Sequence, residues 1–235
     1  MEFIVCNNGE TNIIFLHGWG ADYKSFYFLK DVLQNQKLHF ASLDGFGGTK
    51  PPTDPTIKGY ANRLHSYITK NNLKNVILVG HSFGGRIAIE YASTHSILKL
   101  VLVDSAGLKP RVSIKKLYKT CKYKLYKWLV KNKILNAKHL NNFGSADYRS
   151  ANIQMKEVLK SCLKYNQKNQ LKKIKSKTLI IWGDKDTDTP LYMANTLHRG
   201  IKNSKLVVLK NCRHFCFLDN QYLFFKHLKQ FIDLQ

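Results

Sequence analysis

Runs of apolar residues alternate along the chain with segments of helical periodicity. Seven short runs rich in β-branched and aliphatic residues predict strands, at residues 3–6, 12–16, 38–43, 75–79, 98–103, 178–182 and 206–209. Several are apolar at every position, as in parallel strands that are covered on both faces. Helical patterns fall between them, at residues 23–34, 57–71, 83–94, 191–199 and 222–234. This alternation predicts an α/β fold, with a mainly parallel sheet of about seven strands and helices on both faces.

One segment, residues 109–175, departs from this alternation. Its apolar residues fall at helical spacing, and it contains no strand pattern. A chain of 235 residues suits one domain. We therefore expect residues 1–108 and 176–235 to form a single core, with residues 109–175 inserted as a helical cap over the carboxyl edge of the sheet.

The positive charge of the chain is concentrated in that insertion. The formal net charge is +23, and about 20 Lys and Arg residues between Lys109 and Lys177 accompany only Asp147 and Glu157. Such a charge raises nucleic acid and anionic membrane as partners. No zinc finger, recognition helix or RNA-binding motif accompanies it, so no nucleic-acid partner is expected. The favoured interpretation is that lysines fill solvated faces of the protein.

Cysteine usage and the N-terminal residues bear on the compartment. The five cysteines are irregularly spaced, which is typical of a reducing compartment and argues against a disulfide framework. The first residues lack a basic region followed by a long apolar run. We expect a cytoplasmic protein without a signal peptide or a membrane-spanning segment.

The motif Gly80-His81-Ser82-Phe83-Gly84 has the form G-x-S-x-G and lies between a predicted strand and a predicted helix. This is the context of a nucleophile elbow, in which flanking glycines are needed because the turn is tight. The serine then sits at a helix N-terminus, where the helix dipole and free N–H groups favour developing negative charge. The pattern predicts Ser82 as a nucleophile.

A serine nucleophile needs a base and a group that orients the base. Asp184, Asp186 and Asp188 all follow the predicted strand at 178–182. Asp186 is preferred because it lies far enough past the strand to turn back over the sheet edge, and Asp184 and Asp188 remain alternatives. Asp104, at the end of an earlier strand, is a less favoured acid. His214 follows the last predicted strand and is the expected base.

Two backbone N–H groups should stabilise the oxyanion. One is that of Phe83, directly after the nucleophile, and the other is that of Trp19 in the loop after the strand at 12–16. Gly18 lets this loop approach closely, and the Trp19 ring is expected to line the pocket, so both are also expected to bind substrate. His17 and His81 adjoin these motifs and are interpreted as structural.

Five motifs occur in a fixed order along most of the chain: His17-Gly18-Trp19-Gly20, Asp44-Gly45-Phe46-Gly47-Gly48-Thr49, Gly80-His81-Ser82-Phe83-Gly84-Gly85, Trp182-Gly183-Asp184-Lys185-Asp186 and Cys212-Arg213-His214-Phe215. With them the chain resembles the α/β-hydrolase superfamily, in the cap-bearing branch that includes meta-cleavage-product hydrolases, small esterases and prolyl iminopeptidases. The resemblance implies a Ser82–His214–Asp186 triad. Serine at the elbow disfavours the dehalogenases and epoxide hydrolases, which use aspartate.

The chain departs from that family in two places. The family usually opens with an antiparallel hairpin, whereas only one short strand fits here, so we expect a trimmed sheet edge. Arg213 stands where glycine is frequent; its cation either approaches His214 and lowers its pKa or points to solvent. Cys212 and Cys216 flank His214, but no second pair of ligands is nearby and the triad accounts for the histidine. No metal and no cofactor are expected.

The leading hypothesis is a serine hydrolase that cleaves a small carboxylic ester through an acyl-enzyme. The runner-up is C–C bond hydrolysis on the same scaffold, and a non-catalytic binder is disfavoured by the intact catalytic set. A further hypothesis docks the basic cap on an anionic membrane, which requires Tyr118, Tyr123, Tyr126 and Trp128 on the outer face of the cap. Core packing is the preferred use of those aromatics. The sequence carries no signal for an oligomeric state.

Overall fold

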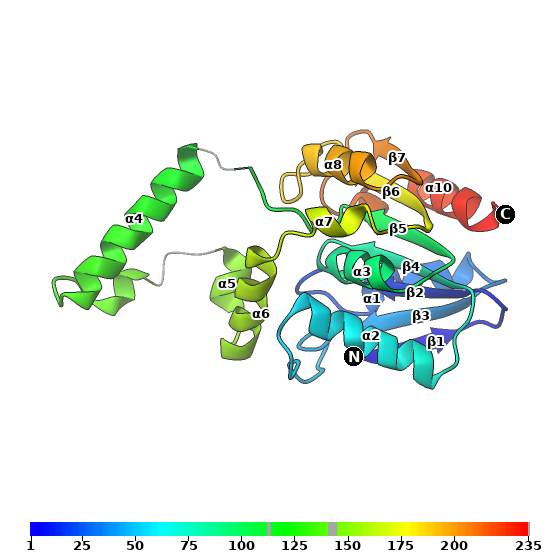
Figure 1. Ribbon diagram of the computed structural model, residues 1–235, viewed down its shortest axis with the longest axis horizontal. Helices are drawn as coiled ribbons and strands as arrows, with labels where there is room; N and C mark the ends of the chain where they lie inside the picture. Colours follow the sequence, from blue (N-terminus) through cyan, green and yellow to red (C-terminus); the bar gives the residue numbers. More distant parts are fainter. Residues whose placement is uncertain (112–113, 141–144, 235) are drawn as a thin grey trace.

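The computed structural model describes residues 1–111, 114–140 and 145–234, and its centre is a seven-stranded sheet (Figure 1). The strand order is β1-β3-β2-β4-β5-β6-β7. Strand β1 pairs antiparallel with β3, and all other neighbours are parallel. The mainly parallel sheet is confirmed, and its edge holds one antiparallel strand instead of a hairpin. The strands are β1 (Glu2–Cys6), β2 (Asn12–Leu16), β3 (Lys37–Ser42), β4 (Val76–His81), β5 (Lys99–Val103), β6 (Lys177–Gly183) and β7 (Ser204–Leu209).

Helices cover both faces of this sheet because successive side chains of a strand point to opposite faces. In β2, Ile14 and Leu16 pack in one core cluster with residues of α2, α3 and α8. Ile13 and Phe15 pack in the other, with residues of α1 and α10. Uniformly apolar strands are therefore buried on both sides, as the sequence predicts. These helices are α1 (Lys24–Tyr27), α2 (Ile57–Lys70), α3 (Phe83–Thr94), α8 (Tyr192–Gly200), α9 (Cys216–Asp219) and α10 (Gln221–Asp233).

One predicted helix, at residues 23–34, is shorter than expected. The chain forms α1 and then the 3-10 helix η1 (Phe28–Asp31). The helical spacing correctly indicates the buried face, since Phe26, Leu29 and Leu33 are all buried. Beyond Tyr27 the chain follows η1, and Asn7 Nδ2 donates to the carbonyl oxygens of Lys30 and Leu33 near its end, at 2.8 and 3.1 Å. The Asn7 side chain, distant in sequence, thus binds two backbone carbonyl oxygens at the end of this segment.

The insertion between β5 and β6 is helical, as predicted. It contains α4 (Ile114–Lys131), η2 (Ala137–Leu140), α5 (Ala146–Ser150), α6 (Ile153–Lys164) and α7 (Lys168–Leu171). Helix α7 packs against α3, and Met155 of α6 is buried with its sulfur against Gly45 in the loop after β3. Figure 1 shows α4 extending away from the sheet. Residues 112–113 and 141–144 of the expected cap, and Gln235 of the core, lie outside the described residues.

The side chains of α3 join the insertion to the core through a buried polar network. Arg86 Nη1 donates to the carbonyl of Tyr165 at 3.2 Å, and the Tyr165 hydroxyl donates to Glu90 at 2.9 Å. Gln167 adds donors to Arg86 O and Glu90, at 2.9 and 3.3 Å. Buried polar groups that hydrogen-bond to one another in this way favour one docking geometry. The C-terminal end of the insertion is therefore held on the core.

The cysteines and the apolarity of the helices bear on the expectations about compartment and membrane. All five cysteines are free thiols. None of the helices in the described ranges combines the length and apolarity needed to cross a bilayer.

Candidate active site

Ser82 lies between β4 and α3 in a backbone conformation that is rare for residues other than glycine. Its φ is 48° and its ψ is −109°, and such strain, about 1–3 kcal/mol, persists only where the surroundings hold it. The Ser82 N–H donates to Val103 O, and its carbonyl accepts from the N–H groups of Gly85 and Ala106, at 3.0 to 3.1 Å. The side chain is half-buried. This is the strand–turn–helix geometry that the G-x-S-x-G motif predicts.

Two other strands bring a histidine and an aspartate to this serine. His214 follows β7, and its Nε2 lies 2.9 Å from Ser82 Oγ. Its Nδ1 lies 2.8 Å from Oδ2 of Asp186, which follows β6. Because Nδ1–H donates to the carboxylate, Nε2 is left as an acceptor that faces the serine hydroxyl. This arrangement can move a proton from serine to histidine.

The loop after β6 distinguishes Asp186 from the two neighbouring aspartates. Asp186 is buried, whereas Asp184 and Asp188 are exposed. Asp186 Oδ1 accepts from the backbone N–H groups of Asp188 and Thr189, at 2.8 and 2.9 Å. These bonds hold the carboxylate so that its other oxygen faces His214. Of the three aspartates in this loop, Asp186 is the one that contacts the base.

Asp104, the fourth candidate acid, is occupied elsewhere. It is fully buried, and its two carboxylate oxygens accept from the backbone N–H groups of Gly183 and Cys216, at 2.8 and 3.1 Å. Burial raises the pKa of Asp104 to about 7, although these hydrogen bonds favour its charged form. Asp104 therefore ties the loop after β6 to the loop that carries His214, and it does not contact the imidazole.

Electrostatics in the site favour a charged aspartate beside a basic imidazole. Burial works against the charge on Asp186, but hydrogen bonds from His214 and Thr189 outweigh it and hold the pKa of Asp186 below its ordinary value. Burial also disfavours the imidazolium, yet the contact with Asp186 prevails and raises the pKa of His214 above its ordinary 6.5. Arg213 does not lower it: its side chain is 80% exposed and lies 4.0 Å from Asp219. Of the two alternatives for Arg213, the structure shows the solvent-facing one.

Thr189 is a site residue that the sequence analysis missed. Its hydroxyl donates to Asp186 Oδ2 at 2.6 Å, beside the bond from His214. The available signal was weak, a Thr three residues after an Asp in a turn. His81, interpreted as structural, also supports the base, because its Nε2–H donates to the backbone carbonyl of His214 at 2.8 Å. Burial lowers the pKa of His81 to about 3, so the ring stays neutral.

The loop after β2 lies directly against the elbow. Gly84 N–H donates to His17 O at 3.0 Å. His17 is buried; its Nε2 accepts from Leu43 N–H at 3.0 Å, and burial lowers its pKa to about 4. Within the described ranges, the N–H groups of Trp19 and Phe83 donate to no protein acceptor. They are therefore available as donors to an oxyanion.

Gly18 is required at its position by close packing. A Cβ there would lie 2.7 Å from His81 Nδ1 and 3.4 Å from Ser82 Cβ. The neighbouring Trp19 ring is half-buried and packs edge-on against Phe46 and Phe83, with centroids 4.9 and 5.4 Å away. Gly18 thus permits the close approach of the backbone, and the Trp19 ring supplies side-chain packing. Separate variants can test these two contributions.

Gly18→Ala is expected to lower kcat by about 10²-fold, because the added methyl displaces the Trp19 N–H from the elbow. Trp19→Ala keeps that N–H and removes only the ring, so we expect its main effect on KM. Steady-state kinetics on a soluble ester, with thermal melting to confirm folding, measure both. Equal kcat losses in the two variants would contradict a separate role for the backbone of this loop.

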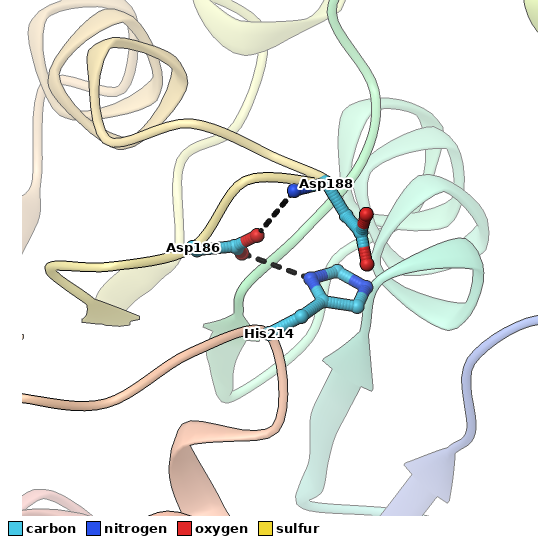
Figure 2. Close-up of side chains that lie close together, drawn as sticks. All are labelled: Asp186, Asp188 and His214. Carbon is cyan, nitrogen blue, oxygen red and sulfur yellow. Dashed lines mark hydrogen bonds and ion pairs between the residues drawn. The ribbon is translucent and has the colours of Figure 1, made fainter.

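Asp186, Asp188 and His214 form the one group of potential metal ligands found among the described residues (Figure 2). Their ligand atoms all lie within 4.8 Å of one another. Both Asp186 oxygens and His214 Nδ1 are engaged in hydrogen bonds to one another and to the loop. A cation here would have to replace the proton that orients the imidazole. Cys212 and Cys216 do not join the group.

Comparisons with known proteins agree with this architecture. Residues 13–225 match the family model described as "Alpha/beta hydrolase family". The AB hydrolase superfamily protein YisY of Bacillus subtilis is 28% identical over 89% of this chain and 87% of its own length. Pimeloyl-[acyl-carrier protein] methyl ester esterase of Wigglesworthia glossinidia brevipalpis is 27% identical over 97% of this chain and 96% of its own.

A solved structure shows the same fold. An esterase from Exiguobacterium antarcticum superposes with a TM-score of 0.78 at 22% identity, covering 99% of this chain and 95% of its own. The family model matches most of the chain, and the fold is the same. The chain therefore belongs to the alpha/beta hydrolase family of enzymes.

Proposed function

We propose that the protein is a serine hydrolase that cleaves a carboxylic ester through a Ser82–His214–Asp186 triad. The observation that carries the proposal is the 2.9 Å approach of His214 Nε2 to Ser82 Oγ, with the other ring nitrogen held by Asp186. Labelling by a fluorophosphonate probe, together with turnover of short-chain nitrophenyl esters, tests it. A folded protein that shows neither would contradict it.

In the proposed first step, Ser82 Oγ attacks the ester carbonyl while His214 Nε2 takes its proton. The C–O bond of the ester then breaks, and His214 returns the proton to the departing alkoxide. Asp186 keeps Nδ1 protonated and stabilises the imidazolium that forms between these events. Water, deprotonated by His214, then attacks the acyl-enzyme and releases the acid and free Ser82.

The N–H groups of Trp19 and Phe83 are the proposed oxyanion donors. They sit on two different elements, the loop after β2 and the start of α3, and the α3 dipole adds positive potential at the second. Such donors contribute most when they are fixed before the reaction begins. The contact between Gly84 N–H and His17 O fixes the two elements relative to each other. Gly18 and Trp19 would also contact substrate. The proposed mechanism uses no metal and no cofactor.

We infer that the substrate is a small acyl ester and that the insertion selects it. The support is in part from relatives, which include a methyl ester esterase and a monoacylglycerol lipase. Met155 of α6 reaches the loops around the elbow, and residues 109–175 are proposed to act as a cap on a core of residues 1–108 and 176–235. The five free thiols suit a reducing compartment, so a cytoplasmic location is proposed.

The activity is expected to fall as the pH drops through a pKa above 6.5, since His214 accepts a proton only when it is neutral and its pKa is raised. Asp186→Asn removes the negative charge that causes the rise, so the acidic limb of its profile should move to lower pH. The pH dependence of kcat/KM, or of fluorophosphonate labelling for the slow variant, measures both. A limb that stays in place in Asp186→Asn would count against Asp186 as the partner of the base.

A further inference from the structure

Helix α4 exposes an apolar stripe. Tyr118, Cys121, Leu125 and Trp128 follow one another at spacings of three and four residues, so they share one face of the helix. All four are exposed, with Tyr118, Leu125 and Trp128 at 68%, 55% and 56%. Core packing was the preferred expectation for the aromatics of this segment, and for Tyr118, Tyr123 and Trp128 it is wrong, because all three are exposed.

No core helix or strand among the described residues packs extensively against this stripe. Among the described elements, η2 alone packs extensively against α4, and Figure 1 shows the helix away from the sheet and its covering helices. A continuous row of exposed apolar side chains is costly in water and generally marks an interaction surface. The stripe therefore calls for a partner with an apolar region.

The rest of α4 is basic. Residues 114–131 contain no Asp or Glu, and Lys122, Lys124, Lys127 and Lys131 are exposed. At 3.6 residues per turn, Lys122 lies about 80° to one side of the stripe's centre and Lys124 about 80° to the other. Ammonium groups thus flank the apolar stripe on both sides. If the stripe were inserted into an apolar layer, these groups would lie at the boundary of that layer.

We propose that α4 docks in the interface of an anionic phospholipid membrane, with the stripe in the boundary between headgroups and acyl chains. Helices with Lys on the polar face and Trp and Leu on the other bind membranes in this way. Lys122 and Lys124 would lie at the level of the phosphates, and lysines near such a surface bind it through its negative potential. This surface does not depend on any chemistry at Ser82.

An anionic lipid surface accounts for both the apolar stripe and the lysines of α4. A nucleic acid would pair with the lysines but leave the stripe in water, and a neutral protein groove would cover the stripe but leave the lysines without counter-charge. The positive charge also extends beyond one helix: about 20 Lys and Arg lie between Lys109 and Lys177. A segment with this excess of positive charge is attracted to an extended anionic surface, which a bilayer provides.

The test is co-sedimentation of the full chain with vesicles of phosphatidylcholine alone or of phosphatidylcholine with phosphatidylglycerol, at low and raised salt. We expect wild type to bind only the anionic vesicles, and more weakly as salt increases. The triple variant Lys122→Glu, Lys124→Glu, Lys131→Glu should lose affinity by about 100-fold or more. The pair Leu125→Ala and Trp128→Ala should lose about tenfold or more.

A matched control carries the same change of charge on the core, as Lys58→Glu, Lys202→Glu and Lys210→Glu, which are also exposed. It should bind nearly as wild type does. The proposal is overturned if wild type does not bind, if it binds both vesicle types equally, or if the control loses as much as the α4 variant. Self-association or binding to an acidic protein that Trp128→Ala abolishes, without vesicle binding, would also overturn it.

Hydrolysis of a soluble ester by wild type is measured in the same preparations, because α4 contributes no residue to the triad. Vesicle binding that fails while ester hydrolysis persists would reject the docking surface and leave the proposed function standing. The reverse result, with binding intact and no hydrolysis by wild type, would reject the proposed function alone.

Discussion

Replacing Ser82 with alanine is expected to reduce kcat for ester hydrolysis on the order of 10⁶-fold, the size of loss found when a triad serine is removed. Among the residues that the structure describes, the Ser82 hydroxyl is the one within hydrogen-bonding distance of His214 Nε2, at 2.9 Å. No acyl-enzyme can form without it, and fluorophosphonate labelling should disappear. Steady-state kinetics at protein concentrations set by absorbance, with thermal melting to confirm folding, measure the loss.

Ser66→Ala is the matched control, since this exposed serine bonds only to Asn62 O within α2. It should retain wild-type kinetics and labelling. If Ser82→Ala turned over esters as fast as this control does, the nucleophile would have to lie elsewhere and the proposed mechanism would fail. Residual activity well below that level fits the proposed oxyanion donors, which remain in the variant.

Replacing Asp186 with asparagine is expected to reduce kcat by about 10⁴-fold while the fold is retained. An amide in this position can turn its NH₂ group toward His214 Nδ1. The ring then carries its proton on Nε2 and cannot accept one from Ser82. The backbone bonds to the remaining carbonyl oxygen hold the loop, so thermal melting should change little. Kinetics with a soluble ester measure the loss.

Asp184→Asn and Asp188→Asn serve as controls from the same loop. Both side chains are exposed, and neither contacts the base through a hydrogen bond or ion pair among the contacts of the described residues. We expect a change within about threefold for Asp184→Asn, as for exposed charges in general. Asp188→Asn should lower the pKa of His214, because the Asp188 carboxylate lies beside the imidazole and helps to raise it, with a smaller loss of kcat than in Asp186→Asn. A larger loss in either one than in Asp186→Asn would transfer the role of the acid to that residue.

The fold followed closely from the order of apolar runs. Buried parallel strands need apolar residues on both faces, so each strand appears in the sequence as a short apolar run that is recognisable without the structure. The helix expected at residues 23–34 is instead the short α1 followed by η1, and Asn7, far away in sequence, bonds to Lys30 O and Leu33 O at the end of this segment. Periodicity reports burial, and it does not report which hydrogen bonds end an element.

The site was predictable where the chemistry depends on local sequence. Ser82 needs a tight turn with glycines before a helix, and this turn is contiguous in the chain. Asp186 was harder, because three aspartates share its loop. Two backbone N–H bonds and the Thr189 hydroxyl hold its carboxylate within the loop, whereas its contact with His214 forms only when β6 and β7 lie side by side.

The sequence by itself determined the family, the order of the strands along the chain and the serine at the elbow, because each depends on residues that are neighbours in the chain. The tertiary structure alone decided which aspartate meets His214, that Arg213 faces solvent, and that the Tyr118 and Trp128 side chains are exposed. Each of these depends on distance between segments or on solvent exposure. Such properties are set when the sheet assembles, and no local pattern of residues encodes them.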